Sequence, residues 1–256
     1  MTTAAGTPIV VEDIVPITTD DARVLAPAEY ERLAVLLDGL TPQDWVRPTD
    51  CPGWDVRSMA GHCIGMASDF TSLPRLARRQ ASSMRAARRS GLQPVDEMTA
   101  QQVGEQAVLD TDALIARLRE VGPVAARWRT DGPAALRRLR IPQEIGGVVE
   151  KWPMSYLLDV ILTRDPWMHR VDITRATGRE MVLTPEHDGR IVADVVAEWA
   201  RRHGQPFTLT LTGPIGATYV AGDGSGETTT LDTVEFCRIV SGRATGTGLL
   251  TEEVPF

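Results

Sequence analysis

Several residue types are scarce or missing in this chain of 256 residues. Asparagine is absent, and only Lys151 among the 27 basic residues is a lysine, so almost all positive charge is carried by arginine. This bias is typical of a GC-rich genome rather than of a particular chemistry. Aromatic residues make up only 5% of the chain, but hydrophobic residues reach 43%, enough to bury one core or two small ones. The composition therefore excludes a disordered chain, a disulfide-rich miniprotein and a collagen-like repeat.

Cysteines and long apolar runs are also few. Cys51, Cys63 and Cys237 form no CxxC pair, which favours a reducing cytosol over an oxidising compartment. The first 20 residues lack the basic start and the apolar run of a signal peptide. The most apolar stretch, Met154–Thr163, has about half the length that a membrane-spanning helix needs, and it contains Asp159. We therefore expect a cytoplasmic protein that does not enter a membrane.

Negative charge is in excess. The net charge is −7 and the sequence pI is about 5.2, so the molecule as a whole repels nucleic acid and anionic lipid. Segment 75–89 is a local exception, because it carries arginines and no acid. Its basic residues are Arg75, Arg78, Arg79, Arg85, Arg88 and Arg89. We interpret this segment as a solvated helix face; salt-sensitive association with nucleic acid is the alternative.

Apolar residues recur at three- and four-residue steps through the first 178 residues, which predicts helices. The expected helices cover residues 28–40, 56–70, 97–121 and 152–176. Asp55 is a good N-cap for the second of them, and His62 lies near its inward face. Gly122-Pro123 is expected to end the third helix and Pro166 to disturb the fourth, with irregular chain at 137–142.

The pattern changes after Gly178. A helix is expected from Pro185 to about His203, followed by strands at 207–211 and 217–220, and by a hairpin turn at Gly222–Gly226. A last helix is expected over 232–241. The sequence thus predicts a mainly α protein with a small α/β domain, divided into a helical domain over 20–178 and an α/β domain over 179–256.

Two of the four histidines can meet on the predicted helices. Asp165 lies four residues before His169, so on a continuous helix both side chains share one face. With His62 they make a set of two histidines and one carboxylate, which can hold a divalent metal and leave a position open. The alternative is that Asp165, whose next residue is proline, only caps a helix while His169 packs inside. His187 and His203 lie near expected helix ends, where exposed capping roles are the simpler interpretation.

Two segments resemble a known family. The run Trp45–Arg57 (WVRPTDCPGWDVR), followed by Ala60-Gly61-His62, resembles the N-terminal signature of the mycothiol-dependent maleylpyruvate isomerase family. Segment 165–178 (DPWMHRVDITRATG) resembles the second signature of that family. The resemblance implies a DinB-like four-helix bundle, followed by a C-terminal domain related to sterol carrier proteins.

The resemblance also implies a metal centre. In this family a divalent metal, zinc in the best-known member, is held by residues that correspond to His62, Asp165 and His169. The best-known enzyme has a glutamate at the position of Asp165, so the carboxylate of this chain is one methylene shorter. A metal with three protein ligands can bind a small thiol and deprotonate it at neutral pH. Mycothiol is the cofactor that the resemblance implies, and the same composition fits the high-GC actinobacteria that make it.

The implied reaction is isomerisation of, or thiol transfer to, a small carboxylate-bearing electrophile. Arg243 resembles an arginine of the family's C-terminal domain that faces the active-site cleft, and Arg238 is the other candidate for this role. We therefore expect an anionic small molecule as the partner, with neither nucleic acid nor a membrane. The alternative function is a metal-independent small-molecule binding protein or biosynthetic enzyme on the same fold.

Overall fold

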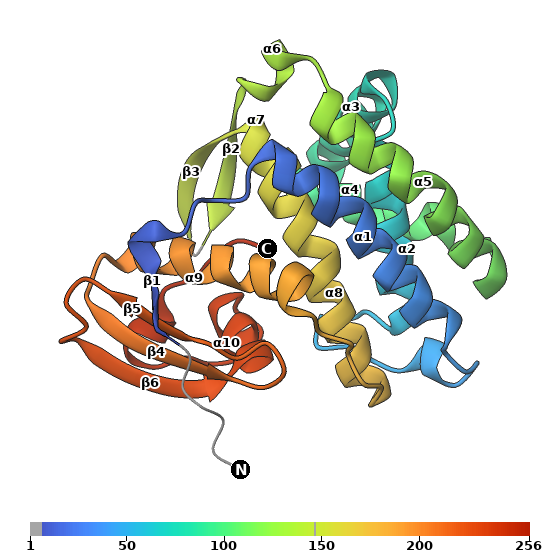
Figure 1. Cartoon of the computed structure of the whole chain (residues 1–256). Helices are drawn as coiled ribbons and strands as arrows, with labels where there is room; N and C mark the ends of the chain where they lie inside the picture. Colours follow the sequence, from blue (N-terminus) through green and yellow to red (C-terminus); the bar gives the residue numbers. More distant parts are fainter. Residues whose placement is uncertain (1–6, 146) are drawn as a thin grey trace. The chain divides into compact units, whose positions relative to one another are not determined.

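The computed structural model describes residues 7–145 and 147–256 (Figure 1). Their contacts divide the chain into two compact units. The helical unit consists of Thr19–Leu139 and Pro153–Glu180, and the sheet unit consists of the segment ending at Thr18, Arg140–Trp152 and Met181–Phe256. The fold is mainly α with a small α/β part. Residues 7–18, which precede the predicted domains, and residues 140–152, which the sequence assigned to the helical domain, thus belong to the sheet unit.

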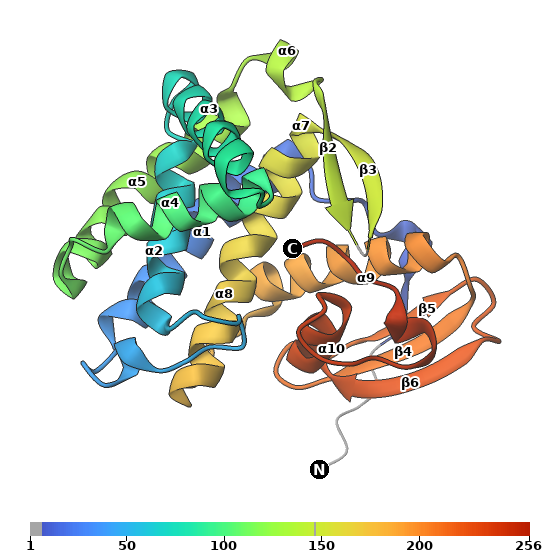
Figure 2. The same cartoon turned by 180° about the vertical axis from the view of Figure 1, so that it is seen from behind.

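The helical unit is a bundle with two additional helices on one side. Its helices are α1 (Thr19–Asp38), α2 (Val56–Asp69), α3 (Leu73–Ser90), α4 (Pro94–Gln106), α5 (Thr111–Asp131), α6 (Ala134–Arg137), α7 (Met154–Tyr156) and α8 (Leu162–Thr177), with a 3₁₀ turn at Asp44–Val46. Helix α1 packs on α5 and α8, and α2 packs on α5, α8 and α4. Helix α3 contacts α4, and Figure 2 shows this pair on the side of α2.

The bundle core is built from the apolar stripes that the sequence predicted. Fully buried members are Leu33 and Leu37 of α1, Val56 and Met59 of α2, and Leu114 and Leu118 of α5. Each such side chain contributes about 1.5–3 kcal/mol through removal of apolar surface from water. This burial explains why these helices pack along the predicted faces.

Two prolines lie inside helices, although the sequence predicted a helix boundary at each of them. Helix α1 starts at Thr19, which makes Pro27 an internal residue. The helix extends this far because its first turns bury Leu25 and other apolar residues. Helix α5 continues through Pro123 to Asp131 and buries Ala125 and Ala126 beyond it. An internal proline costs about 3 kcal/mol, and burial of these turns offsets that cost. The expected end of the third helix at Gly122-Pro123 was therefore wrong.

The stretch expected to form a single helix over 97–121 is two helices. Helix α4 ends at Gln106, and the side chain of Asp110 accepts a hydrogen bond from Ala113 N at 2.8 Å. This N-cap satisfies a backbone donor of the new helix α5. The cap at Asp110 thus provides a new start that the apolar periodicity did not reveal.

The sheet unit has one four-stranded sheet in the order β1-β5-β4-β6. Its elements are β1 (Ile9–Val10), β2 (Arg140–Ile145), β3 (Val148–Pro153), α9 (Arg190–His203), β4 (Phe207–Thr212), β5 (Thr218–Ala221), β6 (Glu227–Asp232) and α10 (Thr233–Val240), with 3₁₀ turns at Val11–Asp13 and Gly248–Thr251 and a π turn at Pro185–Gly189. Strands β2 and β3 form a separate two-stranded sheet, so part of the segment 137–142, which the sequence predicted to be irregular, is the start of a strand. The ring centroid of Trp199 lies 4.8 Å from that of Phe207 and 5.4 Å from that of Phe236. Helices α9 and α10 and strand β4 therefore share one core.

The expected hairpin at Gly222–Gly226 is a crossover instead. Strand β5 is antiparallel to β4, and β6 is parallel to β4 on its other side. The five-residue loop therefore passes the start of β4, and a Cβ at Gly226 would overlap the carbonyl of Pro206. Only glycine permits that approach. Among the described residues, none of the helices is both long and apolar enough to span a bilayer.

Candidate metal centre

Helix α2 carries the first candidate ligand. The side chain of Asp55 caps this helix by accepting a hydrogen bond from Ser58 N at 2.8 Å, as the sequence predicted. His62 lies two turns farther along and is 6% exposed. Its ring therefore points into the bundle.

Helix α8 carries the other two candidate ligands. A π segment, Leu157–Ile161, joins α7 to α8, so residues 154–177 form one helical run and Asp165 is well inside it. The interpretation of Asp165 as an N-cap was therefore wrong. The sequence predicted a disturbance of the helix at Pro166. The irregularity lies earlier, in the π segment, where Leu162 N donates to Leu157 O. Such π turns are frequent near functional sites.

The three candidate ligands converge on one point. His169 Nε2 lies 3.4 Å from Asp165 Oδ1, and His62 Nε2 lies 3.8 Å from the same oxygen. One ligand atom from each residue falls within 4.8 Å of the others. Tetrahedral zinc with bonds of about 2.0–2.2 Å separates its ligands by about 3.3–3.5 Å. The donor set therefore fits a divalent metal after small side-chain shifts.

The far side of each imidazole ring is also arranged for ligation. His169 Nδ1 lies 3.1 Å from Asp172 Oδ2, and His62 Nδ1 lies 2.9 Å from Gln102 Oε1. Both partners are acceptors, so each Nδ1 carries a proton and each Nε2 faces Asp165. Such outer partners fix the tautomer and the orientation of histidine ligands. The sequence did not single out Gln102 or Asp172, although Asp172 follows His169 at a helical spacing of three.

The loop before α2 covers the two rings. Thr49 N donates to Trp54 O at 2.9 Å, and Gly53 has a φ of 80°, which favours glycine. This turn places the ring of Trp54 5.1 Å from His62 and 6.3 Å from His169, measured between ring centroids. The Sγ of Cys51 lies 3.8 Å from Asp172 Oδ2. Cys51, His169 and Asp172 form a second possible ligand group, which shares His169 with the first.

The charges of the site are strongly coupled. Burial disfavours the charged form of His169, but the carboxylates of Asp165 and Asp172 outweigh it and raise the pKa of His169 to about 9. Burial also opposes ionisation of Asp165, but the charge of His169, with a smaller contribution from His62, holds its pKa well below the usual range. Without a metal, His169 and Asp165 are thus an ion pair at neutral pH.

Comparison with known proteins identifies the family. The family model for the mycothiol maleylpyruvate isomerase N-terminal domain matches residues 26–174. The chain belongs to this family. Two solved structures are similar to it over nearly the whole chain: a mycothiol-dependent maleylpyruvate isomerase (19% identity, 96% of this chain and 97% of that chain, TM-score 0.52) and its histidine-to-alanine mutant (18%, 92% of each chain, TM-score 0.50). A search of curated proteins found no match.

The remaining residues that the sequence analysis considered in this member of the maleylpyruvate isomerase family lie in the sheet unit. Arg243 is half-buried in the loop after α10, and Arg238 pairs with Glu235 at 2.6 Å. The role of Arg243 stays a prediction. His187 is 6% exposed, so its expected exposed position was wrong. His203 is half-buried at the end of α9, where its Nδ1 accepts from Gln205 N at 3.0 Å.

Proposed function

We propose that this protein is a divalent-metal enzyme, with zinc as the metal, that uses mycothiol or a similar small thiol. Its reaction is isomerisation of, or thiol transfer to, a small carboxylate-bearing electrophile. Membership of the mycothiol maleylpyruvate isomerase family supports the thiol and the reaction class. The substrate itself is an expectation from chemistry: an anionic small molecule with a double bond or a leaving group that a thiolate can attack.

One observation carries the proposal. His62, Asp165 and His169 converge with both Nδ1 atoms engaged by acceptors, so the two Nε2 atoms and a carboxylate oxygen face one point, where a metal would displace the proton from His169 Nε2. A bound metal would lower the pKa of a coordinated thiol and supply a thiolate at neutral pH. The protein residues would hold the metal, and Trp54 covers the two imidazole rings from the loop side. No protein cysteine is required as the nucleophile.

Metal content tests the proposal directly. After loading with zinc or nickel and desalting, elemental analysis of wild-type protein should give about one metal per chain. His62→Ala, His169→Ala and Asp165→Ala should each lose it, whereas His203→Gln, in the sheet unit, is the matched histidine control. Asp165→Glu, which restores the longer carboxylate, should retain the metal. Wild-type protein without stoichiometric metal would contradict the proposal and favour a metal-independent function.

Arg243 is proposed to bind the carboxylate of the substrate. Arginine matches a carboxylate with paired hydrogen bonds, which lysine cannot reproduce. Arg243→Ala should therefore raise KM for a carboxylate substrate by about ten-fold or more, with unchanged metal content. Arg243→Lys should give a smaller rise. An unchanged KM in the alanine variant would remove Arg243 from the site and leave Arg238 as the candidate.

A further inference from the structure

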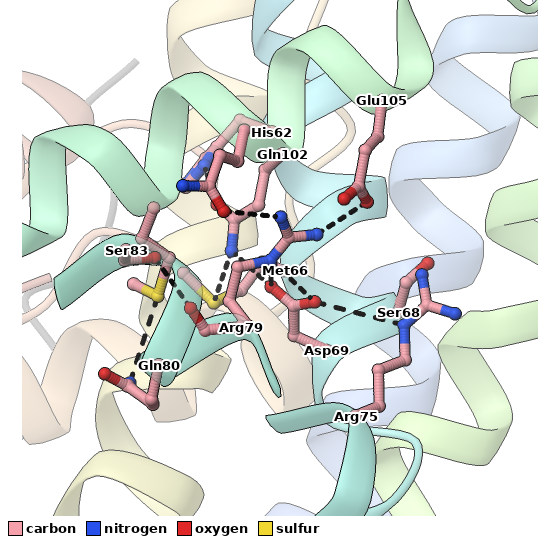
Figure 3. Close-up of polar contacts among 12 residues, drawn as sticks. His62, Met66, Ser68, Asp69, Arg75, Arg79, Gln80, Ser83, Gln102 and Glu105 are labelled. Atoms are coloured by element: carbon pink, nitrogen blue, oxygen red, sulfur yellow. Dashed lines mark hydrogen bonds and ion pairs between the residues drawn. The ribbon is translucent and has the colours of Figure 1, made fainter. Parts of the chain in front are cut away.

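A series of buried polar side chains leads from His62 to the arginine-rich helix α3 (Figure 3). Gln102 Nε2 donates to Asp69 Oδ2 at 2.9 Å, while its Oε1 lies 2.9 Å from His62 Nδ1. Arg79 Nε donates to both oxygens of Asp69, at 3.0 and 2.9 Å. Gln102, Asp69 and Arg79, which we call the His62 relay, are 0%, 1% and 7% exposed. The relay is thus removed from solvent.

The relay determines which way the Gln102 amide faces. The carboxylate of Asp69 is paired with Arg79 and can only accept hydrogen bonds. The NH₂ group of Gln102 must therefore face Asp69, and Met66 Sδ, a weak acceptor, lies on the same side at 3.8 Å. As a result the amide oxygen, rather than the nitrogen, faces His62.

The amide orientation in turn determines the tautomer of His62. An oxygen opposite Nδ1 requires a proton on Nδ1, which leaves the lone pair on Nε2, the atom that faces Asp165. With the amide reversed, its NH₂ group would donate to Nδ1 and the proton would move to Nε2. A protonated Nε2 cannot bind a metal.

A purely structural role explains the relay less well. Buried ion pairs give little net stability, and apolar side chains of similar size pack at least as well between helices. The relay nevertheless joins α2, α3 and α4 at the one histidine of α2 that reaches the metal centre. The outer nitrogen of Arg79 continues to Glu105, whose carboxylate is 2.6 Å away and 49% exposed.

We propose that Gln102, Asp69 and Arg79 are positioning residues that hold His62 in the Nδ1–H tautomer needed for metal binding. The functional meaning of this inference rests on the metal site proposed above. The tautomer itself is a property of the metal-free protein, so it can be measured independently.

Asp69→Asn tests the relay at a distance from the metal. Asparagine can donate to Gln102 Oε1, which allows the Gln102 amide to reverse. Long-range ¹H–¹⁵N spectra of the four histidine rings, recorded on metal-free protein at alkaline pH, report the tautomer. We expect wild-type His62 to show Nδ1–H and Asp69→Asn to shift it toward Nε2–H. Zinc affinity, measured by competition with a chromophoric chelator, should fall about 10- to 100-fold.

Two further variants make the result decisive. Glu105→Gln breaks only the exposed end of the network and should leave both the tautomer and the zinc affinity unchanged. Gln102→Met keeps the Asp69–Arg79 pair, so it remains informative if Asp69→Asn does not fold. It removes the acceptor and should give a mixed tautomer with weaker zinc binding. Folded Asp69→Asn and Gln102→Met with the wild-type tautomer would overturn the inference, whereas absence of zinc binding in wild-type protein would overturn only the proposed function.

Discussion

Two glycines on one face of α2 provide a matched test of how packing supports the candidate metal centre. A Cβ at Gly65 would lie 2.5 Å from Gln102 Cβ and 2.9 Å from Gln102 Cα, so α4 itself is in the way. A Cβ at Gly61, one turn earlier, would lie 3.4 Å from Gln106 Cβ, which is ordinary contact. Both substitutions to alanine add the same methyl group to the same helix. They differ only in the space that α4 leaves.

The expected magnitudes follow from two opposing terms. Alanine is better than glycine in a helix by about 1 kcal/mol, whereas overpacking a core costs about 1–3 kcal/mol. Gly61→Ala should therefore stabilise the protein by up to about 1 kcal/mol, because the first term acts almost alone. Gly65→Ala should destabilise it by up to about 2 kcal/mol, because α4 must retreat by about 1 Å to restore normal contact.

The same displacement reaches the candidate metal centre. A retreat of about 1 Å would lengthen the 2.9 Å contact between Gln102 Oε1 and His62 Nδ1 beyond hydrogen-bonding distance. Gly65→Ala should thus weaken zinc binding about ten-fold or more, while Gly61→Ala should not. Urea unfolding followed by circular dichroism, together with chelator competition, measures both effects. Equal shifts in the two variants, or stronger zinc binding by Gly65→Ala, would refute the reasoning.

Further predictions concern pH and two backbone positions. The pKa of His169 is about 9, so zinc must displace a proton from His169 below that pH. Chelator competition should therefore show a zinc affinity that rises about ten-fold per pH unit from pH 7 to 9. A flat profile would argue against His169 as a ligand. In the metal-free protein, folding raises the pKa of His169 from about 6.5 to about 9, so its ion pair stabilises the folded state fully below about pH 6.5. The urea midpoint of unfolding should therefore fall as the pH rises through about 9. Gly226→Ala should prevent folding of the sheet unit, because its Cβ meets Pro206, and a native near-ultraviolet spectrum would contradict this. Pro123→Ala should stabilise the protein by up to about 3 kcal/mol, because it restores a hydrogen bond of helix α5. The effect is measured as a higher urea midpoint. An unchanged midpoint would mean that the helix has already adapted to the proline.

Local sequence signals predicted some elements well. Asp55 caps the helix that the sequence placed after it, the last helix begins within one residue of the expected position 232, and α9 ends at His203, just before a left-handed glycine, Gly204. These signals involve residues within one turn of each other, so the chain encodes them locally. Where a local breaker opposed long-range burial, as at Pro123, burial prevailed and the prediction failed.

Arg79 illustrates what a charge pattern cannot show. In the sequence it is one of six arginines in a basic segment, and four of these six are exposed as expected. Arg79 instead turns inward and pairs with Asp69, ten residues away on another helix. Nothing in the spacing distinguishes it from its neighbours, because its partner is decided by the packing of α3 on the bundle.

The sequence by itself determined the chemistry of this protein's candidate site. The helical spacing of Asp165 and His169 put two donors on one face, His62 on another inward-facing helix offered the third, and the family signatures favoured the same three residues. Only the tertiary structure decided that the three donors meet, that Asp165 is not a cap, and that Gln102 and Asp172 orient the rings. The physical reason is that helical periodicity fixes which side chains share a face, whereas hydrogen bonds between helices depend on how those faces pack.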